Sequence, residues 1–258
     1  MTEITAWYAR NGRHDLPWRR TRDRWAVLVS EVMLHQTQVP RVAAAWHEFY
    51  GRFPTPAAMA QAGPGAVIQA WGTLGYPRRA RRLWEAAVAI AADGWPDDLT
   101  SLPGVGRYTA RAVAAQCDDS DVPAVEVNGR RVAERTAGSA LSDRDAEPVL
   151  VELGAPLRGR DRLLALMDVG ALVCRPRDPR CDACPLRRPC ATRGARSDER
   201  SSHQPRYGGS FRQRRGRVMA RLRAGEPIEA RSLDADALAS LVDDGLAVVD
   251  SDAVARLP

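Results

Sequence analysis

Apolar side chains recur at helical spacing through most of the first 190 residues. The first such stripe, one face of a helix, consists of Trp25, Leu28, Val29, Val32, Met33 and Gln36. Further helical patterns cover residues 39–50, 57–62, 78–92, 108–117, 128–137 and 161–174. Proline and glycine separate these segments, and alternating strand patterns are scarce. The pattern therefore predicts an all-α fold for this part of the chain.

The pattern changes after residue 190. Residues 191–215 are rich in Arg, Ser, Gly and Gln, which is typical of a linker. Beyond it, the spacing of apolar residues predicts helices over 216–224 and 233–244, followed by short strands at 248–249 and 254–257. Helices followed by a small hairpin predict a winged-helix-like module at the end of the chain.

Length and composition fit a globular protein. At 258 residues with 45% hydrophobic side chains, the chain can bury one large or two modest cores. No apolar run approaches the ~18 residues that a membrane span needs. The N-terminal MTEITAWYAR has no apolar segment of the kind found in signal peptides. We therefore expect a soluble cytoplasmic protein that makes no membrane contact.

The basic residues are all arginine. The net charge is +6, and the 38 residues counted as Lys or Arg contain no lysine. Arginines cluster within 78–82 and again within 212–217. Guanidinium groups suit phosphates, although each cluster is equally typical of a solvated helix face. Because no lysine is present, catalysis through a lysine Schiff base is excluded.

Four cysteines point to a metal cofactor. Cys174, Cys181, Cys184 and Cys190 follow the spacing C-x6-C-x2-C-x5-C. A zinc site usually has two close pairs, whereas only one pair is close here, which favours a 4Fe–4S cluster over zinc. Disulfides are not expected in a protein without a secretion signal. Cys117, the fifth cysteine, is typical of a small core residue.

A glycine-rich turn follows in the segment LPGVGRYTA at residues 102–110. Gly104 and Gly106 flank Val105 and allow a tight turn whose backbone N–H groups point outward. A helix that begins near Arg107 adds its positive N-terminal end. Together these features predict a site that binds phosphate without reading sequence.

Several motifs in order make the chain resemble the helix-hairpin-helix DNA glycosylases that carry an iron–sulfur cluster, and within them the MutY-like adenine glycosylases. The motifs are LPWR at 16–19, SEVMLHQTQV at 30–39, WGTLGYPRRARRL at 71–83, LPGVGRYTA at 102–110, PAVEVNGRRV at 123–132 and the four-cysteine loop. The segment after the cysteines also resembles the tail of short members from actinobacteria.

The resemblance implies a domain organisation. A six-helix barrel containing the helix-hairpin-helix motif is expected over 24–130. A cluster module is expected to combine residues 1–23 with 131–195. A linker over 196–215 and the winged-helix-like tail over 216–258 complete the chain.

The resemblance also implies catalytic roles. Glu31 matches the carboxylic acid that protonates the adenine to be removed, a step that needs a raised pKa. Without its motif, Glu31 would pass for an ordinary helix surface residue. Tyr108 stands where related enzymes with lyase activity carry a lysine, which implies a monofunctional enzyme. We expect Tyr108 to orient Glu126, the second carboxylate.

Residues that contact DNA are implied in the same way. Tyr76 matches a side chain that wedges into the base stack, and His35 stands where the family usually has glutamine. The expected DNA-binding residues are His35, Gln36, Thr37, Tyr76, Arg78, Leu102, Gly104, Val105, Gly106 and Asn128. The partner is double-stranded DNA with a mispaired or damaged base, and the protein is expected to be monomeric and associated with the nucleoid.

Glu126 departs from the family pattern, which has aspartate there to stabilise the positive charge left on the sugar. Glutamate keeps the charge but moves it by about one methylene, and a ~1 Å displacement can cost on the order of a hundredfold in rate. Three alternatives remain: an adenine glycosylase with a rebuilt pocket, a glycosylase for thymine, uracil or an oxidised pyrimidine, and a lesion-binding protein with weak catalysis.

With 68 residues after Cys190, we expect no counterpart of the domain with which long MutY proteins read 8-oxoguanine. The base opposite the target is therefore left open.

Overall fold

The structure is a computed structural model that describes residues 3–196, 198–199, 206–225 and 227–258. It divides into two compact units, one comprising residues 1–31 and 105–201 and the other residues 32–104 and 202–258. The chain passes from the first to the second unit within α2 (Arg24–Leu34). Residues 105–130 thus group with the cysteine segment instead of with the expected barrel over 24–130, because α6 (Arg107–Asp118) packs on α9 (Gly159–Asp168). No helix in the described residues combines the length and apolar character that a membrane span requires.

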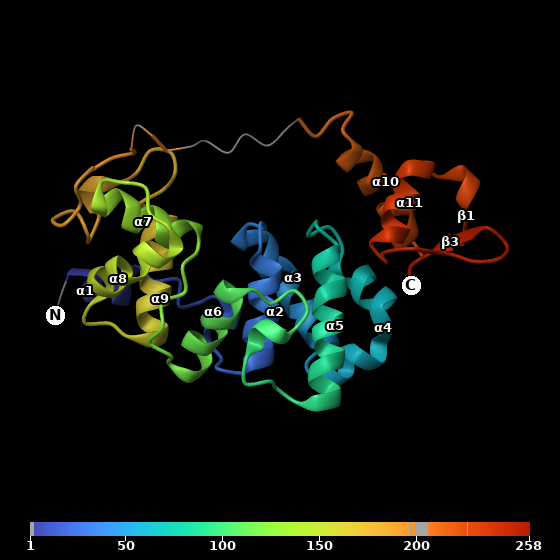
Figure 1. The fold of residues 1–258 in the computed structure, drawn as a ribbon, viewed down its shortest axis with the longest axis horizontal. Helices are drawn as coiled ribbons and strands as arrows, with labels where there is room; N and C mark the ends of the chain where they lie inside the picture. The colour runs from blue at the N-terminus through green and yellow to red at the C-terminus, as the bar shows by residue number, and fades with distance from the viewer. Residues whose placement is uncertain (1–2, 197, 200–205, 226) are drawn as a thin grey trace. The chain divides into compact units, whose positions relative to one another are not determined.

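The first unit is a group of helices (Figure 1), and its buried apolar residues form a larger and a smaller core cluster. Besides α2, α6 and α9, its α-helices are α1 (Glu3–Asn11), α7 (Val127–Ala137) and α8 (Asp143–Gly154). Its shorter elements are the 3₁₀ turns Pro17–Arg19 and Cys181–Ala183 and the π-helical turn Val169–Val173. Ile4, Leu150 and Leu164 from three of these helices meet in the core. The sequence pattern did not predict α8, which contains Pro148 and begins at a Ser142 cap that accepts a hydrogen bond from the Asp145 N–H.

A buried carboxylate fixes the N-terminal segment to α9. Asp168 is fully buried and binds both terminal nitrogens of Arg19, at 2.7 and 2.9 Å. Arg13 adds a side-chain bond of 2.6 Å and a backbone bond of 2.9 Å to the same carboxylate. Arg160 donates to the backbone carbonyls of Arg19 at 2.5 Å and Gln116 at 2.6 Å. The LPWR motif therefore has a structural role here, since Arg19 supplies the charge that Asp168 needs.

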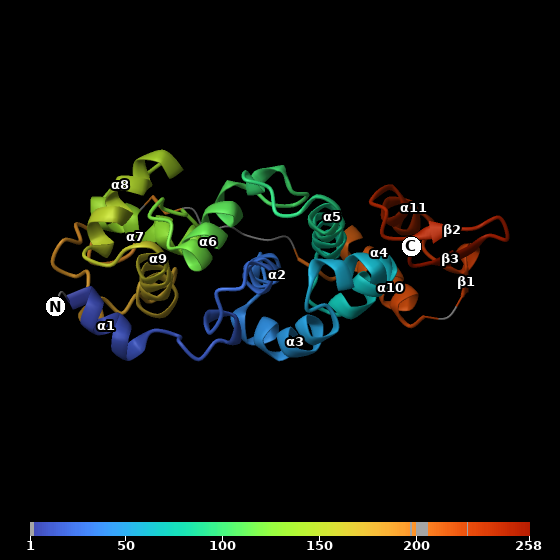
Figure 2. The same ribbon diagram turned by 90° about the horizontal axis from the view of Figure 1, so that it is seen from below.

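The second unit begins with α3 (Val39–Arg52), α4 (Pro56–Trp71) and α5 (Arg78–Asp93), followed by the 3₁₀ turn Leu99–Ser101. Helices α4 and α5 pack against each other, as both views of the fold show (Figures 1 and 2). Residues 64–71 continue as helix beyond Gly63, where the sequence pattern predicted an end. Gly63, at φ 79°, kinks the chain, and Pro64 then restarts the helix because its fixed φ suits a first turn.

The tail contains α10 (Phe211–Arg223), β1 (Ile228–Glu229), the 3₁₀ turn Ala230–Ser232, α11 (Ala235–Asp243), β2 (Val248–Val249) and β3 (Val254–Arg256). The strands form an antiparallel sheet in the order β1-β3-β2, with Ile228 and Val249 both opposite Ala255. This is the order of elements expected of a winged-helix-like module. The predicted linker end at residue 215 is wrong, because the Ser210 side chain caps the helix from Phe211 onward. Residues 197 and 200–205 of the predicted linker lie outside the described residues.

Candidate active site and DNA interface

Glu31 lies on α2 in the interior of the first unit. Its side chain is 4% exposed, so it is no surface residue. Its Oε2 atom accepts a hydrogen bond from the Tyr108 hydroxyl at 3.0 Å, and its Oε1 atom accepts one from Nε2 of Gln116 at 2.8 Å. Burial raises the pKa of Glu31, the two donors oppose this shift, and the charge of Glu126 adds to it. The net shift is upward, so the Glu31 carboxyl group holds its proton to higher pH than an exposed glutamate does.

The partner of Tyr108 differs from the expected one. Its hydroxyl bonds Glu31, whereas the Glu126 carboxylate takes its hydrogen bonds from the start of its own helix. Burial and the nearby carboxylates raise the pKa of Tyr108 well above its usual value, so the phenol remains a neutral donor. The expectation that Tyr108 orients Glu126 is therefore corrected.

Gln116 was missed in the sequence. Its side chain is 1% exposed and lies eight residues after Tyr108 on α6, so both face the same side of that helix. The sequence could have indicated Gln116, because it is an uncharged polar residue within the apolar stripe of α6. Arg160 fixes its backbone carbonyl and thereby connects Gln116 to the ion pairs around Asp168.

Glu126 is the N-terminal cap of α7. Its carboxylate accepts from the backbone N–H groups of Gly129 at 2.6 Å and Asn128 at 2.7 Å, and from Nδ2 of Asn128 at 2.9 Å. Burial raises the pKa of Glu126, while these three donors favour the ionised form. The longer side chain thus folds back onto its own helix, in the manner of a shorter aspartate cap.

Both polar groups of the Asn128 side chain form hydrogen bonds to other residues of the protein. Its Oδ1 accepts from Nη2 of Arg131 at 2.7 Å, while its amide nitrogen holds Glu126. Arg131 also donates to the backbone carbonyls of Gly170 and Cys174, each at 2.7 Å. A Cβ on Gly170 would lie 2.7 Å from Cβ of Asn128, so only glycine permits this approach. The predicted DNA contact of Asn128 stays a prediction, and its amide is already used to orient Glu126.

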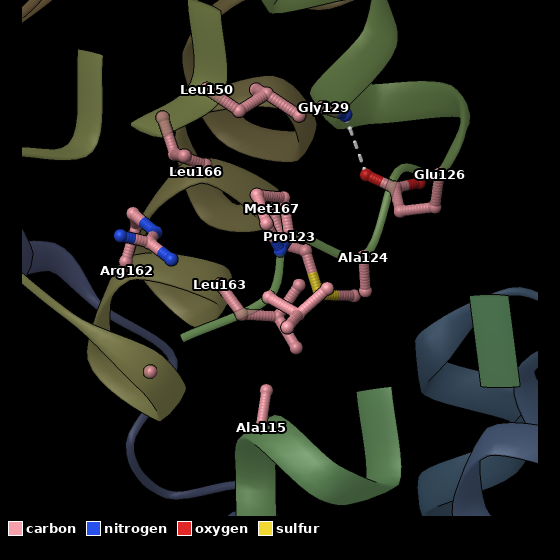
Figure 3. Close-up of a pocket in the computed structure, with 12 residues that line it drawn as sticks. Ala115, Pro123, Ala124, Glu126, Gly129, Leu150, Arg162, Leu163, Leu166 and Met167 are labelled. Atoms are coloured by element: carbon pink, nitrogen blue, oxygen red, sulfur yellow. Dashed lines mark hydrogen bonds between the residues drawn. The ribbon is translucent and has the colours of Figure 1, made fainter. Parts of the chain in front are cut away.

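A small pocket opens beside Glu126 within the first unit. It is lined mainly by apolar side chains, among them Leu150, Leu163, Leu166 and Met167 (Figure 3). In Figure 3 the Glu126 carboxylate lies at the pocket edge and turns toward the Gly129 nitrogen. Glu31 does not line this pocket, so the pocket is separate from the buried Glu31 carboxyl group.

Arg79 organises the expected DNA-binding residues of the second unit. Its Nη1 atom donates to the carbonyls of Val32 at 2.8 Å, Met33 at 2.9 Å and His35 at 2.5 Å, where α2 ends. Its Nη2 atom donates to Thr37 Oγ1 at 2.9 Å and to the carbonyls of residues 74 and 75. Burial lowers the pKa of Arg79 to about 10. One side chain therefore joins the end of α2 to the turn that carries Tyr76.

Two candidate DNA contacts have strained backbones. Tyr76 and Gln36 have φ values of 48° and 55°, in the left-handed region that side chains rarely adopt. Tyr76 is nevertheless 43% exposed, and the Arg79 guanidinium lies 5.6 Å from its ring centroid. Burial and the charge of Arg79 lower the pKa of His35, which favours the neutral imidazole. Strain at an exposed aromatic residue is a feature of functional sites.

The glycine-rich turn has the predicted backbone. Gly104, at φ 78°, is exposed, and a Cβ there would lie 2.7 Å from Cβ of Arg82. Gly106 is exposed and caps α6. Leu102 and Val105 are buried, so their side chains anchor the turn and any DNA contact there falls to the backbone. All four stay predicted DNA-binding residues.

Arg78, another predicted DNA contact, forms an ion pair with Asp244 in the tail. Its side chain is still 69% exposed, so contact with phosphate stays a prediction. The neighbouring Arg79, which the sequence placed only within an arginine cluster suited to phosphate, is the residue that organises the surrounding turns. The sequence could have indicated this role, because Arg79 lies on α5 only three residues after Tyr76.

The four cysteines of the motif line one small pocket, together with Arg135, Val173 and Gly194. Nη1 of Arg135 lies 3.5 Å from Sγ of Cys174, and the backbone nitrogen of Arg193 lies 3.4 Å from Sγ of Cys190. Four thiols with N–H donors around them fit the ligand set of an iron–sulfur cluster. Among the described residues, no three His, Cys, Asp or Glu side chains are grouped as ligands of a single ion.

Cys117 is half-buried in the first unit and does not line the cysteine pocket. Burial and the neighbouring Asp118 raise the pKa of its thiol to about 12, which keeps it protonated.

Known proteins resemble this chain in sequence and fold. Residues 29–153 match the HhH-GPD superfamily of base excision DNA repair proteins. An adenine DNA glycosylase of Mycobacterium tuberculosis is 46% identical over 250 residues, covering 90% of this chain and 82% of that protein. The human adenine DNA glycosylase is 36% identical over 211 residues, which are 74% of this chain and 38% of the human protein.

Two solved structures share the helical fold. A thermostable thymine-DNA glycosylase matches with a TM-score of 0.67 and 27% identity, covering 74% of this chain and 93% of that one. An endonuclease III–DNA complex matches with a TM-score of 0.64 at 21% identity, which shows the fold alone. The helix-hairpin-helix fold expected from the sequence is confirmed. With the extended identity to the mycobacterial enzyme, these matches show that the chain belongs to the adenine DNA glycosylase family within the HhH-GPD superfamily of base excision repair proteins.

Proposed function

We propose that this protein is a monofunctional DNA glycosylase that hydrolyses the N-glycosidic bond of adenine in a mismatched duplex. The observation that carries the proposal is the buried Glu31 carboxyl, held between the Tyr108 hydroxyl and the Gln116 amide. A raised pKa at this position suits a proton donor at neutral pH. The family's adenine glycosylases support the choice of base.

The proposed reaction starts with an adenine turned out of the base stack, since the glycosidic bond is unreachable within it. Glu31 transfers its proton to N7 of the adenine. The C1′–N9 bond then breaks, its electron pair stays with the base, and positive charge develops on the sugar. The ionised carboxylate of Glu126 stabilises that charge. Water adds to C1′ and gives up a proton to Glu126, which leaves an abasic site.

The enzyme is proposed to leave the DNA strand intact. Strand cleavage by related bifunctional enzymes requires an amine that forms a Schiff base with the sugar. The chain has no lysine, and Tyr108 is a neutral phenol bonded to Glu31. Alkali would therefore be needed to break the strand at the abasic site.

Cys174, Cys181, Cys184 and Cys190 are proposed to hold a 4Fe–4S cluster. When bound, such a cluster would cross-link residues 174–190 in the manner of a structural metal. Arg131 connects this segment with the catalytic turn, because it donates both to the Cys174 carbonyl and to Asn128. The chain's own residues thereby link order in the cysteine segment to the position of Glu126.

The proposed partner is double-stranded DNA with a mispaired or damaged base, bound by a protein monomer in the cytoplasm, at the nucleoid. Exposed backbone at Gly104 and Gly106, with the start of α6, supports phosphate binding. The strained and exposed Tyr76 supports insertion into the base stack.

A second candidate function is removal of thymine or another base. Glu126 in place of the family aspartate favours it, as does the likeness to a thymine-DNA glycosylase at 27% identity. A lesion-binding protein with weak catalysis is the third candidate.

Base release from labelled duplexes tests all three. The panel contains adenine opposite 8-oxoguanine, adenine opposite guanine, thymine and uracil mismatches, and oxidised pyrimidines, each analysed with and without alkali. We expect release of adenine, with strand breaks only after alkali. Release of thymine instead would establish the second function, and tight binding without release of any base would establish the third. Strand breaks without alkali would contradict a monofunctional enzyme.

A further inference from the structure

Helix α10 of the tail is strongly basic. It carries six arginines and no acidic residue within Phe211–Arg223. Some of them are used inside the module: Arg215 pairs with Asp244 at 2.5 Å, and Arg221 donates to the Ser232 carbonyl at 2.8 Å. Arg212 in the first turn and Arg217 near the middle of the helix have exposed side chains. The first turns of α10 therefore present positive charge to solvent.

Aromatic rings lie among these arginines. Tyr207 is 50% exposed and Phe211 is 42% exposed. The Arg212 guanidinium carbon lies 5.2 Å from the Tyr207 ring centroid, and that of Arg214 lies 5.1 Å from the Phe211 ring centroid. Many proteins that bind single-stranded nucleic acid combine exposed aromatic rings with guanidinium groups. The bases stack on the rings, and the phosphates bind the cations.

The second helix of the module has the opposite charge. In helix-turn-helix proteins the second helix enters the major groove. Here α11 is capped by Asp234, exposes Asp236 and Asp243, and carries no basic residue. Phosphates would repel this helix. Of the two helices of the module, α10 is therefore the one whose charge suits contact with DNA.

We propose that the start of α10 is a second DNA-binding surface. It is made by Tyr207, Phe211, Arg212 and Arg217, and we call it the arginine–aromatic face. Its ligand is duplex DNA next to an unpaired base: the arginines bind phosphates and one ring stacks on that base. This inference rests on the proposed function only in taking DNA as the ligand.

The charge of the face is tested by the salt dependence of equilibrium binding. The probe is a labelled duplex with one unpaired base, and no catalysis is needed. Each phosphate contact contributes about 0.9 to the slope of log affinity against log salt. Arg217→Ala should reduce that slope by about 0.9, and the double variant with Arg212→Ala by about twice as much. Arg231→Ala is the matched control, because Arg231 is 85% exposed in the same module and pairs locally with Glu229.

The rings are tested separately. Tyr207→Leu and Phe211→Leu keep apolar bulk but remove the flat face, and at least one of them should weaken binding to the unpaired-base duplex about fivefold or more. A fully paired duplex should show little change. Tyr207→Phe and Phe211→Tyr keep the ring and should bind as the wild type does.

Unchanged salt slopes in the arginine variants would overturn the charge assignment. Equal binding by the leucine and ring-preserving variants would overturn stacking. The test measures binding and does not depend on catalysis. A wild type that releases no adenine would contradict the proposed function, but the binding test could still be carried out.

Discussion

The Tyr108 hydroxyl donates a hydrogen bond to Glu31 at 3.0 Å, although the two residues are 77 positions apart in the sequence. A phenol at this place provides a neutral donor to the carboxyl group. Together with Gln116, it holds Glu31 in one orientation within a buried site. The acid of the proposed reaction is thus positioned by α6, while Glu126 is positioned by its own helix.

Removing either donor should change the pH dependence of base release. Both donors favour the ionised carboxylate, so Tyr108→Phe or Gln116→Leu raises the pKa of Glu31 further. Because the acid must be protonated to act, the alkaline limb of the rate profile should move to higher pH. A hydrogen bond of about 1 kcal/mol corresponds to roughly 0.7 of a pH unit.

Single-turnover rates measured across pH check this shift. Tyr50→Phe is the control, since Tyr50 stacks on Trp46 in the second unit. An alkaline limb that stays in place, or moves to lower pH, would contradict the assignment of Glu31 as the acid.

Glu126 should tolerate aspartate better than glutamine. Aspartate keeps the charge and is a favoured helix cap, so Glu126→Asp can retain the backbone bonds from residues 128 and 129. We expect its base release to stay within about tenfold of the wild type, whereas Glu126→Gln should lose on the order of a hundredfold. Single-turnover assays on an adenine mismatch measure both. Equal loss in the two variants would show that the site depends on the longer side chain.

Arg79 should be needed for its forked shape as well as its charge. Lysine cannot span the carbonyls at the end of α2 and the turn at residues 74–75 at once. Arg79→Lys should therefore weaken mismatch binding by about tenfold or more, since small displacements at such a site are costly.

Arg82→Lys is the matched control on the same helix, because Arg82 is 62% exposed and forms an ion pair with Glu85, three residues further along α5. Gel-shift titration with mismatched and paired duplexes gives the comparison. If Arg79→Lys and Arg82→Lys bind mismatched duplex alike, the organising role of Arg79 is wrong.

Cys184→Ser should abolish cluster binding. With one of four ligands lost, the purified protein should lose its brown colour and its iron, and should unfold at a lower temperature. Cys117→Ser is the control, because Cys117 lies outside the cysteine pocket and its thiol has a raised pKa of about 12. Metal analysis with absorption spectra is the measurement. Stoichiometric zinc in a colourless wild type would contradict the cluster assignment.

The Arg19–Asp168 pair should contribute to stability in a pH-dependent way. Burial alone would raise the pKa of Asp168, but the hydrogen bonds from Arg19 and the charges of Arg19 and Arg13 hold it below its usual value. The ion pair therefore adds to the free energy of unfolding at any pH above about 3.9, the pKa of an aspartate in the unfolded chain. This contribution is lost as the pH falls through the lower pKa that Asp168 has in the folded protein.

Arg19→Met leaves a buried carboxylate partly unpaired and should lower the free energy of unfolding by about 3 kcal/mol at neutral pH. Arg22→Met, which breaks an ion pair with both side chains more than half exposed, should cost at most about 1 kcal/mol. Urea unfolding at several pH values tests both. The difference between Arg19→Met and wild type should shrink in acid, and a constant difference would contradict the linkage.

The sequence determined much of what depends on neighbours along the chain. Helical periodicity predicted α3, α5, α6 and α7 close to their observed bounds. The glycines at 104 and 106 predicted the tight turn, and the spacing of the four cysteines predicted a shared pocket. These features follow from backbone conformation and short-range spacing, which a sequence displays directly.

The tertiary structure decided the partners of each functional side chain. Glu31 and Gln116 are 85 positions apart, and no local pattern indicates that they share a hydrogen bond. The Tyr108 hydroxyl donates to Glu31 and not to Glu126. The Glu126 carboxylate instead accepts hydrogen bonds from the backbone at the start of α7. Arg79 and Arg78 are adjacent and alike in sequence, yet Arg79 is half-buried and donates to backbone carbonyls, whereas Arg78 is exposed and pairs with Asp244. Such differences arise from how helices pack, because packing alone determines which polar groups lose water and must find a partner within the protein.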